Sequence, residues 1–136
     1  MSEATELALR ALRHRDRSRL DLDRRLELAG IPAGERAKAL DGLAEAGLLS
    51  DVRFAETRAR ALAERAAGDA LIRRDLAQHG IGDDVVEEVV AALRPETERA
   101  EQAFRKRGGG AKALRYLAGK GFSAESLERV SGDSLH

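Results

Sequence analysis

The sequence has no cysteine, no tryptophan and only two prolines among 136 residues, and aromatic side chains make up 3% of it. The absence of cysteine excludes disulfides, thiolate nucleophiles and cysteine-ligated metal sites. The scarcity of aromatic rings argues against a base-stacking platform for single-stranded nucleic acid. No stretch approaches the roughly 20 apolar residues that a membrane-spanning helix needs. Since no signal peptide is apparent either, we expect a soluble, cytoplasmic protein without membrane association.

The residues that are abundant favour helices. Alanine, leucine, arginine and glutamate are strong helix formers, and 35% of the chain is charged, with 24 basic and 24 acidic residues in balance. Between residues 85 and 93, valines and a leucine recur at helical spacing, and Ser18 and Ser50 stand where helix N-caps are expected. These signals predict an all-α protein with helices over residues 4–14, 18–29, 32–46, 51–66, 69–79, 82–94, 96–106, 111–119 and 123–131.

A short pattern recurs three times along the chain. Each copy has a leucine, three further residues, a glycine and a large apolar residue, as in 26–31, 76–81 and 117–122. We interpret it as the turn between the second and third helices of a three-helix unit used three times. A chance likeness between glycine-ended helices is the alternative, because glycine ends roughly a third to a half of helices. The predicted repeats are 1–49, 50–94 and 95–136, the last with a short C-terminal tail from Ser131 onward.

Nothing in the sequence has the spacing of a catalytic or metal site. The three histidines are far apart, whereas zinc needs three or four converging ligands. The acidic cluster at 83–88 is typical of a helix start, and the serines read as caps rather than nucleophiles. The glycine-rich stretch 107–112 lacks the Gly-Lys-Ser/Thr ending of a phosphate-binding loop. We therefore expect a protein that is not an enzyme and uses no metal or cofactor.

Residues 15–20 and residues 47–55, which read Gly-Leu-Leu-Ser-Asp-Val-Arg-Phe-Ala, are the most characteristic stretches of the chain, and 68–81 and 112–123 add weaker matches. In these stretches the chain resembles the RecX family of RecA regulators. The resemblance runs from about residue 4 to residue 131. It implies tandem three-helix domains in an elongated, curved monomer that binds along the groove of the RecA–DNA filament. It also implies inhibition of RecA ATPase, strand exchange and coprotease activities, and so a role in recombination, DNA repair and the SOS response.

The zero net charge hides a segregation of charge along the chain. Residues 10–25 carry a net charge of +4, residues 83–101 carry −5, and residues 105–120 hold six basic side chains and no acidic one. Some charges have an opposite partner four residues away on a predicted helix, among them Glu56–Arg60 and Asp69–Arg73. Such pairs indicate solvated helix faces rather than binding surfaces.

Eight of the basic residues that lack such a partner are candidates for partner binding. They are Arg15, Arg58, Arg74, Lys106, Arg107, Lys112, Arg115 and Lys120. Aligned along one side of the stack, they would suit phosphates or an acidic protein surface, although surface charge of this kind can also serve solubility alone. We expect them to contact the RecA nucleoprotein filament, with a possible direct weak contact to DNA. The alternative is a helical-repeat protein that binds nucleic acid without RecA, which the neutral charge and scarce aromatics disfavour.

Overall fold

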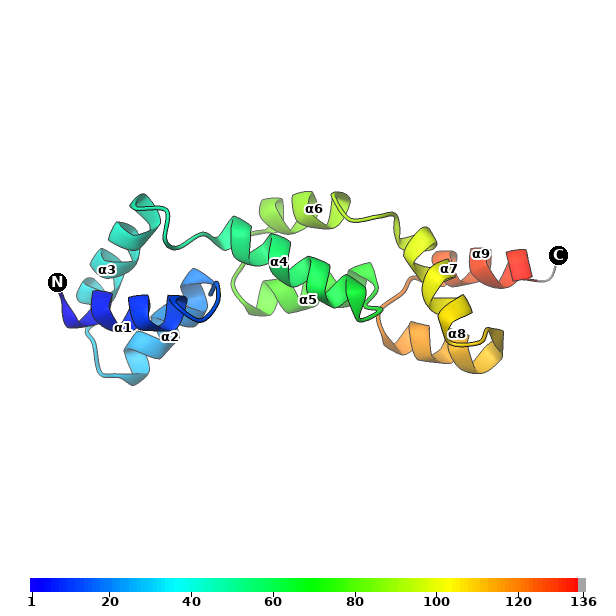
Figure 1. The fold of residues 1–136 in the computed structure, drawn as a ribbon, viewed down its shortest axis with the longest axis horizontal. Coiled ribbons are helices and arrows are strands. Elements are labelled where there is room, and N and C mark those ends of the chain that lie inside the picture. Colours follow the sequence, from blue (N-terminus) through cyan, green and yellow to red (C-terminus); the bar gives the residue numbers. More distant parts are fainter. Residues whose placement is uncertain (135–136) are drawn as a thin grey trace.

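The computed structural model describes residues 1–134. Within that range the secondary structure is α-helix joined by short loops, as predicted, with no strand. The helices are α1 (Glu3–Leu12), α2 (Arg19–Leu28), α3 (Ala33–Glu45), α4 (Asp51–Glu64), α5 (Asp69–Gln78), α6 (Asp83–Ala91), α7 (Glu96–Lys106), α8 (Gly110–Gly119) and α9 (Ala124–Ser134). They follow one another in groups of three along an elongated molecule, with the two termini at opposite ends (Figure 1). We refer to α1–α3, α4–α6 and α7–α9 as repeats one, two and three.

Each repeat has its own hydrophobic core, and the second helix supplies its central leucine. Leu26, Leu76 and Leu117 are all fully buried, and each belongs to a separate apolar cluster. Every helix packs mainly on the other two helices of its own repeat. Because three short helices enclose only a small core, the contacts between repeats contribute to the stability of the whole array.

The helix starts predicted from serine are confirmed. Ser18 Oγ accepts a hydrogen bond from the Asp21 N–H at 3.1 Å, and Ser50 Oγ accepts one from the Arg53 N–H at 3.1 Å. Ser123 caps α9 in the same way. These bonds satisfy amides that have no partner within the first turn of a helix, so local sequence is sufficient to place these boundaries.

The glycine of the recurring pattern does two different things. Gly30, Gly80 and Gly121 have positive φ angles of +84°, +78° and +89°, so each turn favours a residue without a side chain. A Cβ on Gly80 would also lie 2.7 Å from Leu20 Cβ, whereas a Cβ on Gly30 would have nothing within 4 Å. Gly121 approaches Leu71 of repeat two as Gly80 approaches Leu20 of repeat one. Glycine therefore also allows each later repeat to pack closely on the one before it.

An acidic residue at the start of the first helix of each later repeat joins it to the preceding repeat. Asp51 Oδ1 accepts a hydrogen bond at 2.7 Å from the N–H of Arg19, the first residue of α2. Glu96 Oε2 accepts one at 2.8 Å from the N–H of Asp69, the first residue of α5. The same chemistry therefore sets how each pair of neighbouring repeats is stacked, since a carboxylate at a helix N-terminus is favourable.

The joint between repeats one and two is completed by His79, which caps α5. Its Nδ1 lies 2.6 Å from Asp21 Oδ2, and its ring centroid lies 5.1 Å from that of Phe54. This histidine therefore contributes to packing between helices and is only partly exposed.

The end of the chain differs from the prediction. Helix α9 continues to Ser134, three residues beyond the predicted end, so the tail expected from Ser131 is helical as far as Ser134. Residues 135–136, including the third histidine, lie outside the described residues. Among the helices of residues 1–134, none is both long enough and apolar enough to cross a bilayer.

Candidate functional site

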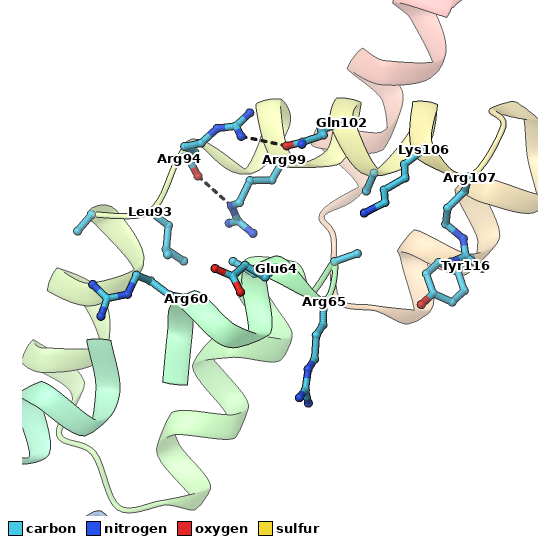
Figure 2. A pocket seen from close by; sticks show the side chains of 14 residues that line it. Arg60, Glu64, Arg65, Leu93, Arg94, Arg99, Gln102, Lys106, Arg107 and Tyr116 are labelled. Carbon is cyan, nitrogen blue, oxygen red and sulfur yellow. Dashed lines mark hydrogen bonds between the residues drawn. The ribbon is translucent and has the colours of Figure 1, made fainter. Parts of the chain in front are cut away.

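A cleft of about 670 Å³ lies where repeat two meets repeat three, and we call it the joint cleft (Figure 2). Its lining residues are Arg60, Ala63, Glu64, Arg65, Ala66, Ala92, Leu93, Arg94, Arg99, Gln102, Ala103, Lys106, Arg107 and Tyr116. Six of them are cationic and one, Glu64, is anionic. The cleft is therefore a strongly basic hollow on a protein whose net charge is zero.

The ends of two helices form the walls of the joint cleft. The last turns of α4 supply Arg60 and Glu64, and Arg65 is the C-cap of that helix. The last turn of α7 supplies Lys106, and Arg107 is its C-cap. Cations at a helix C-terminus are stabilised by the helix dipole, so both walls present positive charge where their helices end.

Deep in the cleft, Arg99 links the two repeats and is not available to a ligand. Its side chain is 8% exposed. Nη1 donates to the carbonyl of Ala67 at 2.9 Å, Nε donates to the carbonyl of Arg94 at 2.9 Å, and Nη2 is paired with the Asp69 carboxylate. Since Asp69 begins α5 and Arg99 lies in α7, this buried ion pair holds repeat three against repeat two.

Glu96 fixes the same joint from the start of α7. One carboxylate oxygen accepts from Ser126 Oγ at 2.7 Å and from the Ser123 N–H at 3.0 Å, and the other accepts from the Asp69 N–H. Burial acts to raise the pKa of Glu96, but hydrogen bonds from the serines and from these backbone amides outweigh it and lower the pKa below its ordinary value. The ionised carboxylate therefore ties α5, α7 and α9 together.

Three cations of the cleft are free to bind. Arg60, Arg65 and Lys106 are exposed, and within residues 1–134 none of their side chains forms a hydrogen bond or ion pair. Arg107 is exposed as well, and its guanidinium carbon lies 3.3 Å from the centroid of the Tyr116 ring, a cation–π contact. Both walls therefore carry free charged donors, and Tyr116 lies beside Arg107 at one end of the cleft (Figure 2).

Comparison with known proteins gives the family. A sequence profile of the second three-helix domain of RecX proteins matches residues 50–90. The regulatory protein RecX of Acidithiobacillus ferrooxidans is 38% identical over 143 residues, which cover 96% of this chain and 90% of that protein. This chain belongs to the RecX family. The RecX protein of Chromohalobacter salexigens is 37% identical, over 90% of this chain and 87% of that protein.

The fold agrees with solved RecX structures. The crystal structure of RecX from Lactobacillus salivarius superposes with a TM-score of 0.81 at 20% sequence identity, covering 96% of this chain and 94% of that one. A second crystal structure, of a regulatory protein RecX, gives a TM-score of 0.79 at 22% identity. At these identities the likeness concerns the fold alone, and it confirms the helical-repeat architecture inferred from the RecX resemblance.

The structure distributes the eight candidate basic residues unevenly over this RecX fold. Lys106 and Arg107 line the joint cleft. Lys112 lies one turn before Tyr116 in α8, Arg115 is next to that tyrosine, and Lys120, the C-cap, lies one turn after it. The exposed side of α8 therefore extends the basic surface beyond the cleft. The remaining candidates, Arg15, Arg58 and Arg74, lie away from the cleft lining.

Arg58 does not have the free side chain that the sequence pattern suggested. Its Nε and Nη2 donate to the two carboxylate oxygens of Asp75, both at 2.8 Å. This hydrogen bonding raises the pKa of Arg58 and lowers the pKa of Asp75. The search for partners looked only four residues along one helix, whereas Asp75 lies 17 residues away on α5. Arg58 therefore bridges α4 and α5 within repeat two.

The same rule assigned wrong partners to Arg60 and Asp69. Arg60 was expected to pair with Glu56, but no such ion pair is present in the described part of the chain. Asp69 pairs with Arg99 rather than with Arg73, which binds Glu87 at 3.0 Å. Arg60 and Arg65 line the cleft with free side chains and were not among the candidates, whereas Arg94 pairs with Glu98, four residues later.

Arg65 was not recognised as an unpaired cation because of the acidic residue that follows it. An acidic residue, Asp69, stands four positions later, but α4 ends at Glu64, so the two do not share a helix face. The predicted helix 51–66 also ends before Asp69, so the sequence already indicates that Arg65 has no acidic partner on its own helix.

Proposed function

We propose that this RecX-family chain is a regulator of RecA that binds the RecA–DNA filament through the joint cleft and the exposed side of α8. In this proposal it acts as a cytoplasmic monomer and inhibits RecA ATPase, strand exchange and coprotease activities in recombination, DNA repair and the SOS response. The observation that carries the proposal is the set of free cations, Arg60, Arg65 and Lys106, held on two walls of one cleft. The name regulatory protein RecX, borne by its relatives, supports a regulatory role.

The chemistry of the cleft suits a filament of protein and DNA. Such a filament presents phosphates and carboxylates, and arginine binds both in a bidentate manner. Unpaired surface cations also steer an anionic partner during encounter. We infer a binding rather than a catalytic role, because the hydroxyls of Ser18, Ser50 and Ser123 cap helices and the charged side chains that line the cleft are cationic apart from Glu64.

Direct binding to nucleic acid without RecA is the second candidate. It is favoured by α8, where Lys112, Arg115 and Lys120 surround the half-exposed ring of Tyr116. Against it stands the balance of 24 basic and 24 acidic residues, since proteins that bind nucleic acid alone usually carry net positive charge.

Charge reversal at the cleft tests the proposal. RecA ATP hydrolysis on single-stranded DNA is titrated with the wild-type chain, with Lys106→Glu, and with the double variant Lys112→Glu and Arg115→Glu. The wild-type chain should inhibit, and the cleft variant and the α8 double variant should each need a concentration roughly tenfold higher for the same inhibition. Lys38→Glu is the matched control, because Lys38 is exposed on repeat one and far from the cleft.

Two results would contradict the proposal. One is equal inhibition by Lys106→Glu and by the control variant. The other is no effect of the wild-type chain on RecA, together with tight binding to the DNA alone. Binding to DNA alone is therefore measured in parallel, and a steep dependence on salt concentration would identify it as phosphate binding. Circular dichroism of each variant shows whether the helices are intact.

A further inference from the structure

The joint cleft continues into a second hollow along repeat two. This smaller hollow has a volume of about 270 Å³ and shares Arg60, Ala92 and Leu93 with the joint cleft. Its other lining residues are Val52, Glu56, Glu88 and Val89. Arg60 and Leu93 lie at one end of the joint cleft, and Arg107 and Tyr116 lie at the other (Figure 2). The two hollows therefore form one groove, which we call the long groove.

One side of the long groove is a single row of side chains on α4. Val52, Glu56, Arg60 and Glu64 are spaced four residues apart, so they lie along one face of that helix. Twelve positions at about 1.5 Å each give a length of roughly 18 Å. An extended peptide of about six residues covers that distance.

The two ends of the long groove differ in chemistry. The smaller hollow has the carboxylates of Glu56 and Glu88, which have no ion-pair partner among residues 1–134, beside apolar side chains. One of these apolar side chains, Val52, is 45% exposed, whereas most large apolar residues of the described chain are buried or partly buried. The joint cleft at the other end has Arg65, Lys106 and Arg107.

This difference in charge between the two ends of the groove distinguishes a nucleic-acid strand from a protein segment as the partner. A nucleic-acid strand lying along the whole groove would bring its phosphates against two carboxylates and an apolar patch, which is unfavourable. A protein segment can instead carry a basic group at one end, an apolar side chain next to it and acidic groups at the other end. Apolar contact combined with complementary charge is how proteins achieve specificity for one another.

We propose that the long groove is a docking site for a segment of the RecA protein rather than for the DNA of the filament. The segment places an apolar side chain against Val52 and Leu93, a basic group near Glu56 and Glu88, and carboxylates on the cations of the joint cleft. This proposal rests on the proposed function, since it takes the RecA filament as the partner and specifies which component of it fills the groove.

Variants at the acidic and apolar end test the proposal. Val52→Glu puts a charge into the apolar patch, and the double variant Glu56→Lys and Glu88→Lys reverses both carboxylates. Binding of each chain to RecA–DNA filaments and to the same oligonucleotide without RecA is measured by fluorescence anisotropy. Leu28→Glu is the matched control, because Leu28 is an apolar residue on repeat one that is 90% exposed. All four positions face solvent at least in part, so the helices should be retained in each variant, as circular dichroism would show.

We expect both groove variants to bind the filament roughly tenfold more weakly than the wild type and the Leu28→Glu control. Their binding to the oligonucleotide alone should not become weaker. Tighter filament binding by the two lysine substitutions would overturn the proposal, because it would mean that phosphates occupy that end. Filament binding equal to that of the wild type in both groove variants would also overturn it.

These outcomes separate this proposal from the proposed function. If Lys106→Glu is defective while both groove variants match the wild type, the function stands and the docking of a RecA segment is wrong. If the wild-type chain itself neither binds nor inhibits RecA filaments, the proposed function fails, and the groove proposal fails with it.

Discussion

Truncation of Arg99 to alanine should destabilise the protein more than the loss of any exposed ion pair. The guanidinium makes three contacts, to the carbonyls of Ala67 and Arg94 and to the Asp69 carboxylate, and its side chain is 8% exposed. Removal of one partner of a buried ion pair typically costs about 3–5 kcal/mol, because the other charge is left uncompensated. Asp69 is 22% exposed, so water can solvate part of it. We therefore expect a decrease of about 3 kcal/mol in the free energy of unfolding.

Chemical denaturation followed by circular dichroism measures this decrease. The control is Arg105→Ala, because Arg105 is 73% exposed and reaches Glu101 only at 3.7 Å. An exposed pair within one helix contributes about 0.3–0.5 kcal/mol, so the control should unfold almost as the wild type does. A decrease of less than about 1 kcal/mol for Arg99→Ala would refute the reasoning, since it would show that the joint does not depend on this buried charge.

Two further predictions concern the joints between repeats. The pKa of Glu96 is lowered in the folded state, so its contribution to stability is present above the ordinary pKa of a glutamate and is lost as the pH falls towards the folded value. Glu96→Gln should therefore have a lower free energy of unfolding than the wild type at neutral pH, and this free energy should fall less between about pH 5 and pH 3. Denaturation at a series of pH values measures both. An equal dependence of the free energy of unfolding on pH in the two proteins would contradict this prediction. Gly30→Ala should cost about 1 kcal/mol through its positive φ alone. Gly80→Ala should lower the free energy of unfolding by about 1–3 kcal/mol more than Gly30→Ala does, because Leu20 has to move. Equal thermal stabilities of the two alanine variants would argue against this close contact.

The elements predicted from local signals agree closely with the structure. Serine caps, glycine turns and apolar spacing act within one or two helical turns, so the residues that decide them are neighbours in the chain. For this reason α4, predicted over residues 51–66, runs over Asp51–Glu64. The largest differences are at two helix ends. Helix α6, predicted to reach residue 94, ends at Ala91. Helix α9 extends to Ser134 although the sequence there contains Gly132 and resembles a tail.

The candidate site could be predicted only in part. The basic stretch 105–120 led to Lys106 and Arg107, and both line the joint cleft. The other wall of the cleft comes from α4, more than 40 positions earlier, and no sequence pattern indicates that Arg60 and Lys106 face one hollow. That juxtaposition depends on how repeat three stacks on repeat two, which Glu96 and Arg99 decide through contacts about 30 residues apart.

The sequence by itself determined the helices, their caps and turns, and the recurrence of the leucine–glycine pattern, because these depend on interactions between residues a few positions apart. Only the tertiary structure decided which charges are free. Arg58 is neutralised by Asp75 and Asp69 by Arg99, whereas Arg60 is left without its expected partner. An ion pair forms between side chains that are close in space and partly shielded from water, and the stacking of helices, rather than distance along the chain, brings them together.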